Sequence, residues 1–249
     1  MLNYRNISYG FVALLILFVL LLGFDIVQWA YFFLLLFAYI FILFLGAVII
    51  KMNFYTISIN RLKDKSSVLL TFDDGPHPQR TIALLDLLDE YQVKAVFCVI
   101  GKNAKEYPEV LKEVHQRGHL IANHSYSHSK QFDFFSIKQM LNDVEKANAI
   151  IEEIIGERPR LFRPPFGITN PRIHKLIVAS NLLSLGWSFR SFDTTKQTND
   201  KIFRKLKSFI KGGEILLFHD SEERNLELMK MVLPWLSERF KLNNNNIIN

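Results

Sequence analysis

The 249-residue sequence has little cysteine and little proline, and charged side chains are scarce in its first fifty residues. The single cysteine, Cys98, excludes an internal disulfide framework and a zinc site built on cysteines. Eight prolines without a glycine period exclude a collagen-like fibre. An apolar fraction of 49% excludes a disordered chain, because disorder requires low hydrophobicity and high net charge.

The net charge of +6 is spread along the chain rather than gathered in a basic run. A scattered excess of this size is compatible with an anionic partner but is weak evidence for one. We therefore expect no nucleic-acid partner.

Charge is distributed very unevenly between the two parts of the sequence. Residues 1–50 carry only Arg5 and Asp25, and residues 51–249 carry all the other charged side chains. Two apolar runs, 7–24 and 29–50, are each long enough for a helix that spans a hydrocarbon core of about 30 Å. The sequence predicts a membrane segment, residues 1–51, in which two transmembrane helices form a hairpin that turns near Asp25 and Gln28.

Two alternatives to this hairpin are a buried pair of core helices and a cleaved signal peptide. Core helices are apolar on one stripe, whereas these runs are apolar all round. A signal peptide has a shorter apolar stretch followed by small residues at a cleavage site. We therefore expect an integral protein of a bacterial inner membrane.

The orientation in the membrane stays open. Arg5, Lys51 and the basic residues that follow place the rest of the chain in the cytoplasm if both runs span. If only residues 29–50 span, the remainder lies outside.

The rest of the chain alternates short apolar strands with amphipathic helices, which favours an α/β fold with a parallel sheet or barrel. We expect residues 52–65 to form a polar connector, residues 66–241 a soluble domain, and residues 242–249 a disordered, Asn-rich tail. Strands are predicted at 68–72, 95–100, 120–123, 161–163, 182–187 and 215–219. Helices are predicted at 81–91, 108–117, 136–155, 171–180, 200–210 and 226–240.

Reactive side chains stand where these strands end: Asp73, Asp74, His124, Arg163 and His219. In parallel barrels such residues gather at the carboxyl ends of the strands, so the pattern predicts a single site.

The adjacent carboxylates in residues 71–76, TFDDGP, repel each other, and a metal bound by one of them relieves that cost. A turn with solvated aspartates is the alternative. In residues 124–128, HSYSH, a helical turn would place His124 and His128 on one face, although a pair of structural histidines fits too. Together Asp74, His124 and His128 supply three ligands suited to zinc with positions left open, and Asp73 remains as a general base.

Two further motifs are ambiguous when taken alone. Residues 163–167, RPPFG, offer Arg163 either as the partner of a buried carboxylate or as an exposed side chain in a proline-rich turn. In residues 215–220, ILLFHD, His219 stands at the end of a buried strand. A histidine in this position has either a structural or a catalytic role.

In this order the four motifs resemble the polysaccharide deacetylase family, also called the NodB homology domain, over residues 71–220. Residues 94–101, KAVFCVIG, and 118–125, GHLIANHS, match as well. The resemblance implies a distorted (β/α)7 barrel of the NodB type and hydrolysis of N-acetyl groups on amino sugars. It also implies one divalent metal ion, usually zinc, with cobalt or nickel as alternatives, bound by Asp74, His124 and His128.

The resemblance further implies a role for each remaining residue of the site. Asp73 is the general base, Arg163 orients it, and His219 is the general acid. In the substrate-binding part, the backbone N–H of Phe166 holds the oxyanion and Leu217 lines the acyl pocket.

The sequence departs from the family in its fourth motif, which often reads Asp-x-x-Asp-Trp. Asp193 matches and is placed to tune His219, but Arg190 replaces the first acid and Thr194 the aromatic residue. Phe166 stands where tyrosine is frequent. These changes alter the sugar groove more than the metal centre, and Arg190 is a candidate contact for an anionic head group.

The sequence thus predicts a membrane-anchored, metal-dependent carbohydrate N-deacetylase, a hydrolase of non-peptide C–N bonds. Its substrate is an N-acetyl or N-formyl amino sugar in a glycan, in peptidoglycan or in a lipid-linked saccharide. A catalytically inactive glycan-binding module of the same fold is the alternative. A hairpin that mainly recruits partners is a third reading.

Overall fold

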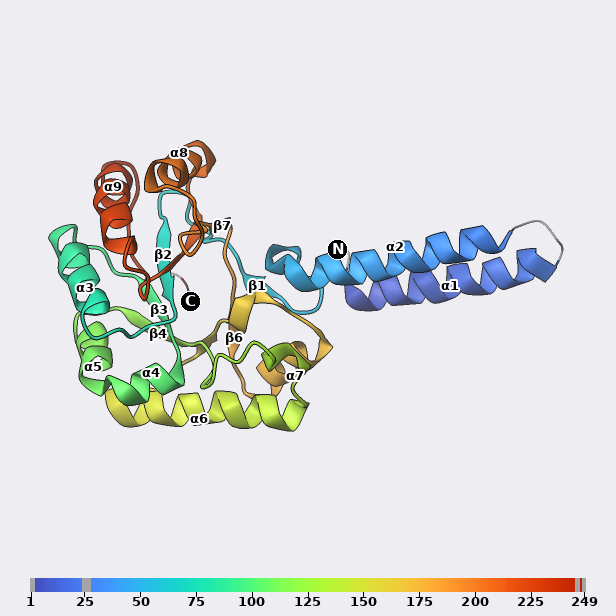
Figure 1. The fold of residues 1–249 in the computed structure, drawn as a ribbon, viewed down its shortest axis with the longest axis horizontal. Coiled ribbons are helices and arrows are strands. Elements are labelled where there is room, and N and C mark those ends of the chain that lie inside the picture. The colour runs from blue at the N-terminus through green and yellow to red at the C-terminus, as the bar shows by residue number, and fades with distance from the viewer. Residues whose placement is uncertain (1–2, 24–27, 245–246, 248–249) are drawn as a thin grey trace.

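The computed structural model describes residues 3–23, 28–244 and 247. Two N-terminal helices, α1 (Tyr4–Gly23) and α2 (Trp29–Val48), lie side by side and project away from the rest of the chain (Figure 1). The rings of Phe11 and Tyr39 stack between them, with centroids 4.0 Å apart. The predicted turn at Asp25 lies outside the described residues.

The two helices have the length and composition of membrane spans. Each has 20 residues, the mean hydropathies of their most apolar 18-residue stretches are 2.3 and 2.6, and only 6% of each stretch is buried. This exposure argues against the alternative of a buried pair of core helices. A signal sequence can have the same length and apolar composition, so these two properties do not distinguish it from a membrane span.

The remaining chain forms a curled, parallel eight-stranded sheet in the order β1-β6-β5-β4-β3-β2-β8-β7. Its strands are β1 (Ser58–Ile59), β2 (Leu69–Asp73), β3 (Val96–Val99), β4 (Leu120–Asn123), β5 (Leu161–Phe162), β6 (Leu183–Leu185), β7 (Phe189–Arg190) and β8 (Ile215–His219). No ladder joins the edge strands β1 and β7 in the part of the chain that is described, so the sheet is an open curl.

This arrangement corrects the expected seven-stranded barrel in two places. The predicted connector contributes β1, which pairs with β6 through Ser58 and Ser184. The predicted strand 182–187 stops at Leu185, and a separate strand, β7, follows at Phe189–Arg190. Both additions are two residues long, too short to show a period in the sequence.

Helices cover the outside of the curl (Figure 1). They are α3 (Arg80–Glu90), α4 (Gly101–Glu106), α5 (Pro108–Gln116), α6 (Ile137–Ile155), α7 (Pro171–Ala179), α8 (Asn199–Phe209) and α9 (Asn225–Ser237). Local signals explain the longest of these, α6: Ser136 and Gln139 form a capping box at its start, and Gly156 at φ 77° ends it. The short helix α4 lacks such signals and was not predicted.

Side-chain alternation along β2 separates the core from the inner face of the curl. Phe72 packs outward against Phe97 and Phe218, with ring centroids 5.2 and 6.0 Å away. Because neighbouring residues of a strand point to opposite faces, Thr71 and Asp73 point inward. The inner face therefore receives polar groups at the carboxyl end of the sheet.

The tail differs from the predicted disorder in the residues described. Leu242, Asn244 and Ile247 are buried, and Asn244 Nδ2 donates to the carbonyl oxygens of Ala95 and Gly118, both at 3.2 Å. The apolar side chains cover the core, and the amide pairs two carbonyl groups near the start of β3 and β4, which is the physical reason for this order.

The hairpin docks on the sheet domain at the carboxyl end of α2. The N–H of Thr169 donates to the carbonyl oxygen of Ala47 at 2.9 Å, and the N–H of Tyr4 donates to Phe54 O at 3.0 Å. At Gly46 an added Cβ would lie 2.2 Å from the Phe54 ring, so this approach requires glycine. The end of α2 is thereby held against the domain.

Candidate active site

The carboxyl ends of the strands surround a cavity of about 200 Å³. Asp73 ends β2 and His219 ends β8, while His124 and Arg163 directly follow β4 and β5. The expectation that the strand ends meet at one place is therefore confirmed. The cavity is lined by Asp73, Asp74, His124, His128, Phe166, Gly167, Trp187, Arg190, Thr194, Leu217 and His219.

Asp74, His124 and His128 converge in this cavity. Asp74 Oδ1 lies 3.6 Å from His124 Nε2 and 3.5 Å from His128 Nε2, and the three ligand atoms lie within 4.8 Å of one another. Two ligands of a tetrahedral zinc ion, each about 2.0–2.1 Å from the metal, stand about 3.4 Å apart. Asp74 Oδ1 is also buried without a hydrogen-bond partner, as expected of an atom reserved for a cation.

The His124 ring is held in the tautomer that a metal ligand needs. Its Nδ1 lies 2.8 Å from the carbonyl oxygen of Arg163, which can only accept, so Nδ1 donates and Nε2 keeps its lone pair. Burial, together with the neighbouring His124, lowers the pKa of His128 and favours its neutral form too.

The segment 124–128 is a loop and not the helical turn expected from the spacing of its histidines. Ser125 and His128 have φ values of 66° and 45°, in the left-handed region. Asp143 Oδ1 accepts from the N–H of Tyr126 at 2.7 Å, and Ser125 Oγ accepts from that of His128 at 3.0 Å. The histidines meet because these two side chains hold the backbone of the loop in place. The contact with Asp143 comes from a helix further along the chain, so the spacing of the two histidines in the sequence does not reveal it.

Asp73 forms an ion pair with Arg163 in the buried wall of the cavity. Arg163 Nη1 donates to Asp73 Oδ1 at 2.6 Å and to Thr71 Oγ1 at 2.8 Å. Burial alone raises the pKa of the Asp73 carboxyl, but Arg163, His124 and His219 together outweigh it and hold that pKa below its usual value. Asp73 Oδ2 remains on the side of His124, 3.7 Å from its Nε2.

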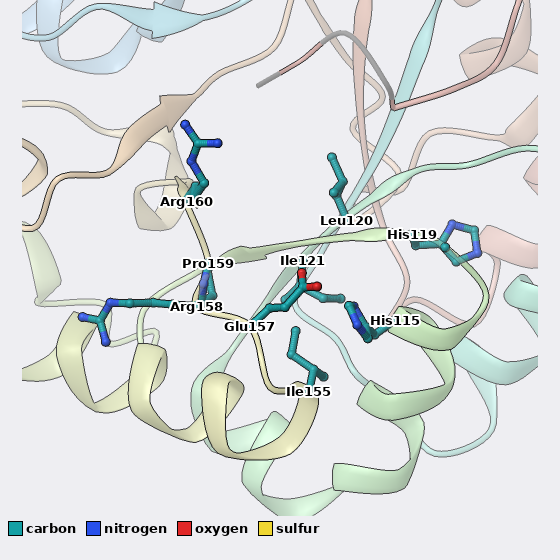
Figure 2. A pocket seen from close by; sticks show the side chains of 10 residues that line it. His115, His119, Leu120, Ile121, Ile155, Glu157, Arg158, Pro159 and Arg160 are labelled. Carbon is teal, nitrogen blue, oxygen red and sulfur yellow. The ribbon is translucent and has the colours of Figure 1, made fainter. Parts of the chain in front are cut away.

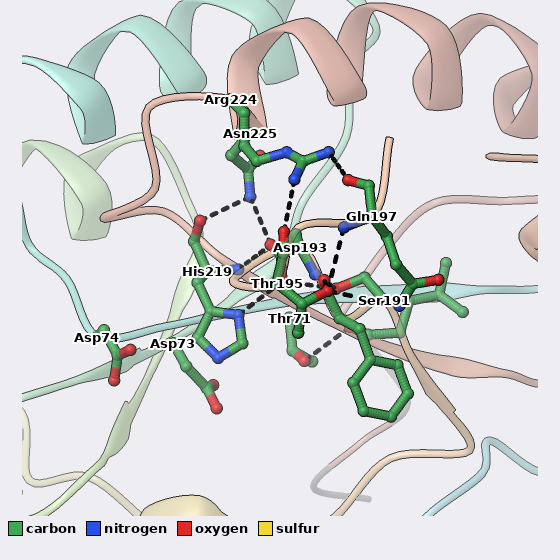
Figure 3. A network of polar contacts seen from close by, with 12 residues as sticks. Thr71, Asp73, Asp74, Ser191, Asp193, Thr195, Gln197, His219, Arg224 and Asn225 are labelled. Atoms are coloured by element: carbon green, nitrogen blue, oxygen red, sulfur yellow. Dashed lines mark hydrogen bonds and ion pairs between the residues drawn. The ribbon is translucent and has the colours of Figure 1, made fainter. Parts of the chain in front are cut away.

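His219 lies beside Asp73 on the neighbouring strand β8 and is fixed by Asp193 (Figure 3). Asp193 Oδ1 lies 2.8 Å from His219 Nδ1, and Asp193 Oδ2 accepts from the His219 N–H at 2.8 Å. Asn225 Nδ2 donates to His219 O at 2.7 Å. Burial disfavours the charged ring, but the hydrogen bond and charge of Asp193 raise the pKa of His219 to about 9.

The mouth of the cavity carries the predicted substrate-binding residues. Phe166 is 41% exposed, and its ring centroid lies 4.7 Å from that of His128. Leu217 is buried in the wall. The Arg190 guanidinium lies 5.8 Å from the Trp187 ring and 5.1 Å from the Phe192 ring, with its Nε buried and unpaired.

Sequence reasoning missed Thr71, Trp187 and Asp220. Thr71 is visible in the sequence as a hydroxyl within an apolar strand, and Asp220 as a carboxylate directly after the strand that ends at His219. Thr81 Oγ1 donates to Asp220 Oδ2 at 2.6 Å, and burial raises the pKa of Asp220 to about 7. A Cβ on Gly75 would lie 2.2 Å from this carboxylate, so the DDGP turn needs glycine there.

A second cavity, of about 230 Å³, lies at the opposite end of the sheet (Figure 2). Leu120 begins β4 there, and Arg160 precedes β5. His119 lies in this region, and its Nδ1 accepts from the N–H of Ala95 at 3.1 Å. Burial lowers the pKa of His119 to about 4, in keeping with a structural histidine.

Comparisons with known proteins agree with this geometry. The family model for polysaccharide deacetylases matches residues 60–182. A chitooligosaccharide deacetylase of Azorhizobium caulinodans is 31% identical over 159 residues, which cover 64% of this chain and 75% of that protein. A peptidoglycan-N-acetylglucosamine deacetylase of Bacillus cereus is 30% identical over 180 residues, 71% of this chain and 65% of that protein.

The fold is similar to that of a solved peptidoglycan deacetylase, PdaC of Bacillus subtilis. The two structures match with a TM-score of 0.67 and 29% identity, over 75% of this chain and 89% of the solved one. In sequence, the chain spans only 36% of the length of the full PdaC protein.

Proposed function

The chain belongs to the polysaccharide deacetylase family, and we propose that it is a membrane-anchored, metal-dependent hydrolase of the N-acyl group of an amino sugar. The observation that carries the proposal is the convergence of Asp74, His124 and His128 beside the Asp73–Arg163 pair. His219 completes the site from the neighbouring strand β8, where it is the register partner of Asp73.

The donor set suits one divalent ion, for which zinc is our first choice and cobalt or nickel the alternatives. A bound ion of this kind lowers the pKa of water and polarises an amide carbonyl. The two histidines and the unpaired oxygen of Asp74 would hold it.

Asp73 and His219 divide the proton transfers between them. Asp73 Oδ1 is committed to Arg163, so Oδ2 is the atom that accepts the proton of the attacking water as general base. His219 Nδ1 is committed to Asp193, so Nε2 is the atom that protonates the leaving amine. The raised pKa of His219 keeps that proton in place near neutral pH.

The polar and apolar walls of the cavity position the acyl group. The backbone N–H of Phe166 would donate to the oxyanion, and Leu217 would limit the acyl pocket to a small group. Formyl and acetyl differ by one methyl, a difference worth only about 1–3 kcal/mol in a pocket. Acetyl is our first choice, with formyl as a close variant.

The helices α1 and α2 would anchor the enzyme in the inner membrane, with the catalytic domain over residues 66–241. The relatives described above include deacetylases of peptidoglycan and of chitooligosaccharides, and these are the substrate classes to test first. The side of the membrane is open, and activity of a phosphatase fused to the C-terminus reports it: periplasmic activity excludes the cytoplasmic orientation.

The deciding experiment measures acetate and formate released from chitooligosaccharide and peptidoglycan fragments by the zinc-loaded full chain in detergent micelles. We expect release by the wild type and none by the matched Asp73→Asn variant. Saturable glycan binding without release by the wild type would instead identify a catalytically inactive binding module.

A further inference from the structure

A further cavity, of about 320 Å³, lies between the end of α2 and the outer edge of the sheet. One wall consists of Val48, Ile49, Ile50 and Lys51, and the other of Trp187, Ser188, Phe189, Arg190, Phe192 and Phe209. We call these ten residues the membrane-side groove. Trp187 and Arg190 also line the active-site cavity, so the two cavities adjoin at these side chains.

The groove lies at the level where a lipid head group would sit if α2 spans the membrane. Twenty residues of helix extend about 30 Å, the thickness of a hydrocarbon core, so Val48 would stand at its boundary. The hydrogen bond from the N–H of Thr169 to Ala47 O holds this end of α2 against the domain. If α2 spans the membrane, the active-site cavity therefore lies next to a groove at the membrane surface.

The lining combines apolar surface with positive charge. Seven of the ten residues have apolar or aromatic side chains, Arg190 and Lys51 are cations, and none is acidic. The buried Nε of Arg190 has no hydrogen-bond partner, and no ion pair involves Arg190 among the described residues. Leaving this buried N–H without a hydrogen bond costs free energy, and an anionic acceptor would form a strong, charge-assisted hydrogen bond with it.

We propose that the membrane-side groove binds the phosphate and the adjoining hydrocarbon chain of a prenyl phosphate-linked amino sugar. The phosphate pairs with Arg190, the chain lies along Val48 and Phe209 towards the membrane, and the sugar enters the active-site cavity past Trp187. This rests on the proposed function, and it narrows the substrate from glycans in general to a lipid-linked precursor.

The test uses native mass spectrometry of the full chain released from detergent micelles, with farnesyl phosphate as probe. Farnesol is the matched neutral ligand, and inorganic phosphate is the soluble anion. The probes carry no sugar and no amide, so the result does not depend on deacetylation. Acetate release from soluble chitooligosaccharide, measured separately, tests the hydrolase.

We expect the wild type to bind farnesyl phosphate about tenfold or more tightly than farnesol, the ratio that one charge-assisted hydrogen bond supplies. Arg190→Gln should bring the two affinities close together. Val48→Phe narrows the groove and should weaken both ligands, whereas Val178→Phe, at an exposed valine of α7 outside both cavities, should weaken neither. Equal binding of farnesyl phosphate and farnesol by the wild type would overturn the proposal. Displacement of farnesyl phosphate by equimolar inorganic phosphate would overturn it too, since it would indicate a site for soluble anions.

Discussion

Arg163 donates from Nη1 to Asp73 Oδ1 at 2.6 Å, and both side chains are almost completely withdrawn from solvent. The same guanidinium also donates to Thr71 Oγ1, Leu185 O and Gly186 O, at 2.8, 3.3 and 3.0 Å. Arg163 therefore ties β2 to β6 while it fixes one oxygen of Asp73. The ion pair therefore stabilises the fold. It also occupies only Oδ1 of Asp73, so Oδ2 remains available to accept a proton.

Arg163→Met leaves the carboxylate of Asp73 buried without its partner, so we expect the free energy of unfolding to fall by about 3–5 kcal/mol. Urea denaturation of the full chain in detergent measures the change. Arg160→Met, at an exposed arginine, should stay within about 0.5 kcal/mol of the wild type. Combining Arg163→Met with Asp73→Asn should recover part of the loss, and no recovery would mean that the charge of Asp73 is not its cause.

Asp73→Asn should keep the metal and lose turnover. Asn has nearly the same shape as Asp but cannot accept the proton, and a positioned general base contributes about 10²–10⁴-fold. Metal content by mass spectrometry and acetate release on the same sample separate the two effects. Normal turnover with normal metal content would rule out Asp73 as the base.

His128→Ala should reduce bound zinc from about one ion per chain to a small fraction, because one of three protein ligands is lost. His174→Ala is the matched control, since His174 lies on α7 outside the active-site cavity. Mass spectrometry after zinc loading and desalting gives the stoichiometry. Equal zinc in both variants would contradict the ligand set.

Asp193→Asn should move the alkaline limb of the pH–rate profile to lower pH. Asp193 raises the pKa of His219 to about 9, and the general acid is active only while protonated. Without the carboxylate charge that pKa falls, so activity is lost at a lower pH than in the wild type. Asp200→Asn, an exposed aspartate in the first turn of α8, should leave the profile unchanged. If the alkaline limb does not move in Asp193→Asn, His219 is not the group whose deprotonation causes the loss of activity at high pH.

Asp133→Asn should change how stability depends on pH. Burial raises the pKa of Asp133 from 3.8 to about 6, and its Oδ1 is buried without a hydrogen-bond partner. An acid with a raised native pKa binds its proton more tightly in the folded state, so its contribution to stability is lost as pH rises from about 4 to about 6. Wild-type stability should therefore fall by more than that of Asp133→Asn over this window, and above it the variant should be the more stable. Parallel urea denaturation curves from pH 4 to about 8 check this expectation.

Much of the fold was predictable because its signals are local. The strand at 215–219 and the helix at 136–155 were predicted within a residue of β8 and α6, since apolar periodicity and caps lie within each segment. The two-residue strands β1 and β7 and the short helix α4 have no period to recognise. Partners far along the chain define the strands: Ser58 pairs with Ser184, and Arg190 with Leu217.

By itself the sequence determined which side chains stand at the strand ends and which runs are apolar enough to span a membrane, because both are properties of consecutive residues. Only the tertiary structure decided that His124 and His128 meet through a left-handed loop rather than a helical turn. It alone decided that Arg163 holds one oxygen of Asp73 and leaves the other available. It also brought Arg190 and the end of α2, more than a hundred residues apart, to one groove. Those relations depend on contacts between distant segments, and such contacts form only when the sheet curls and the hairpin docks.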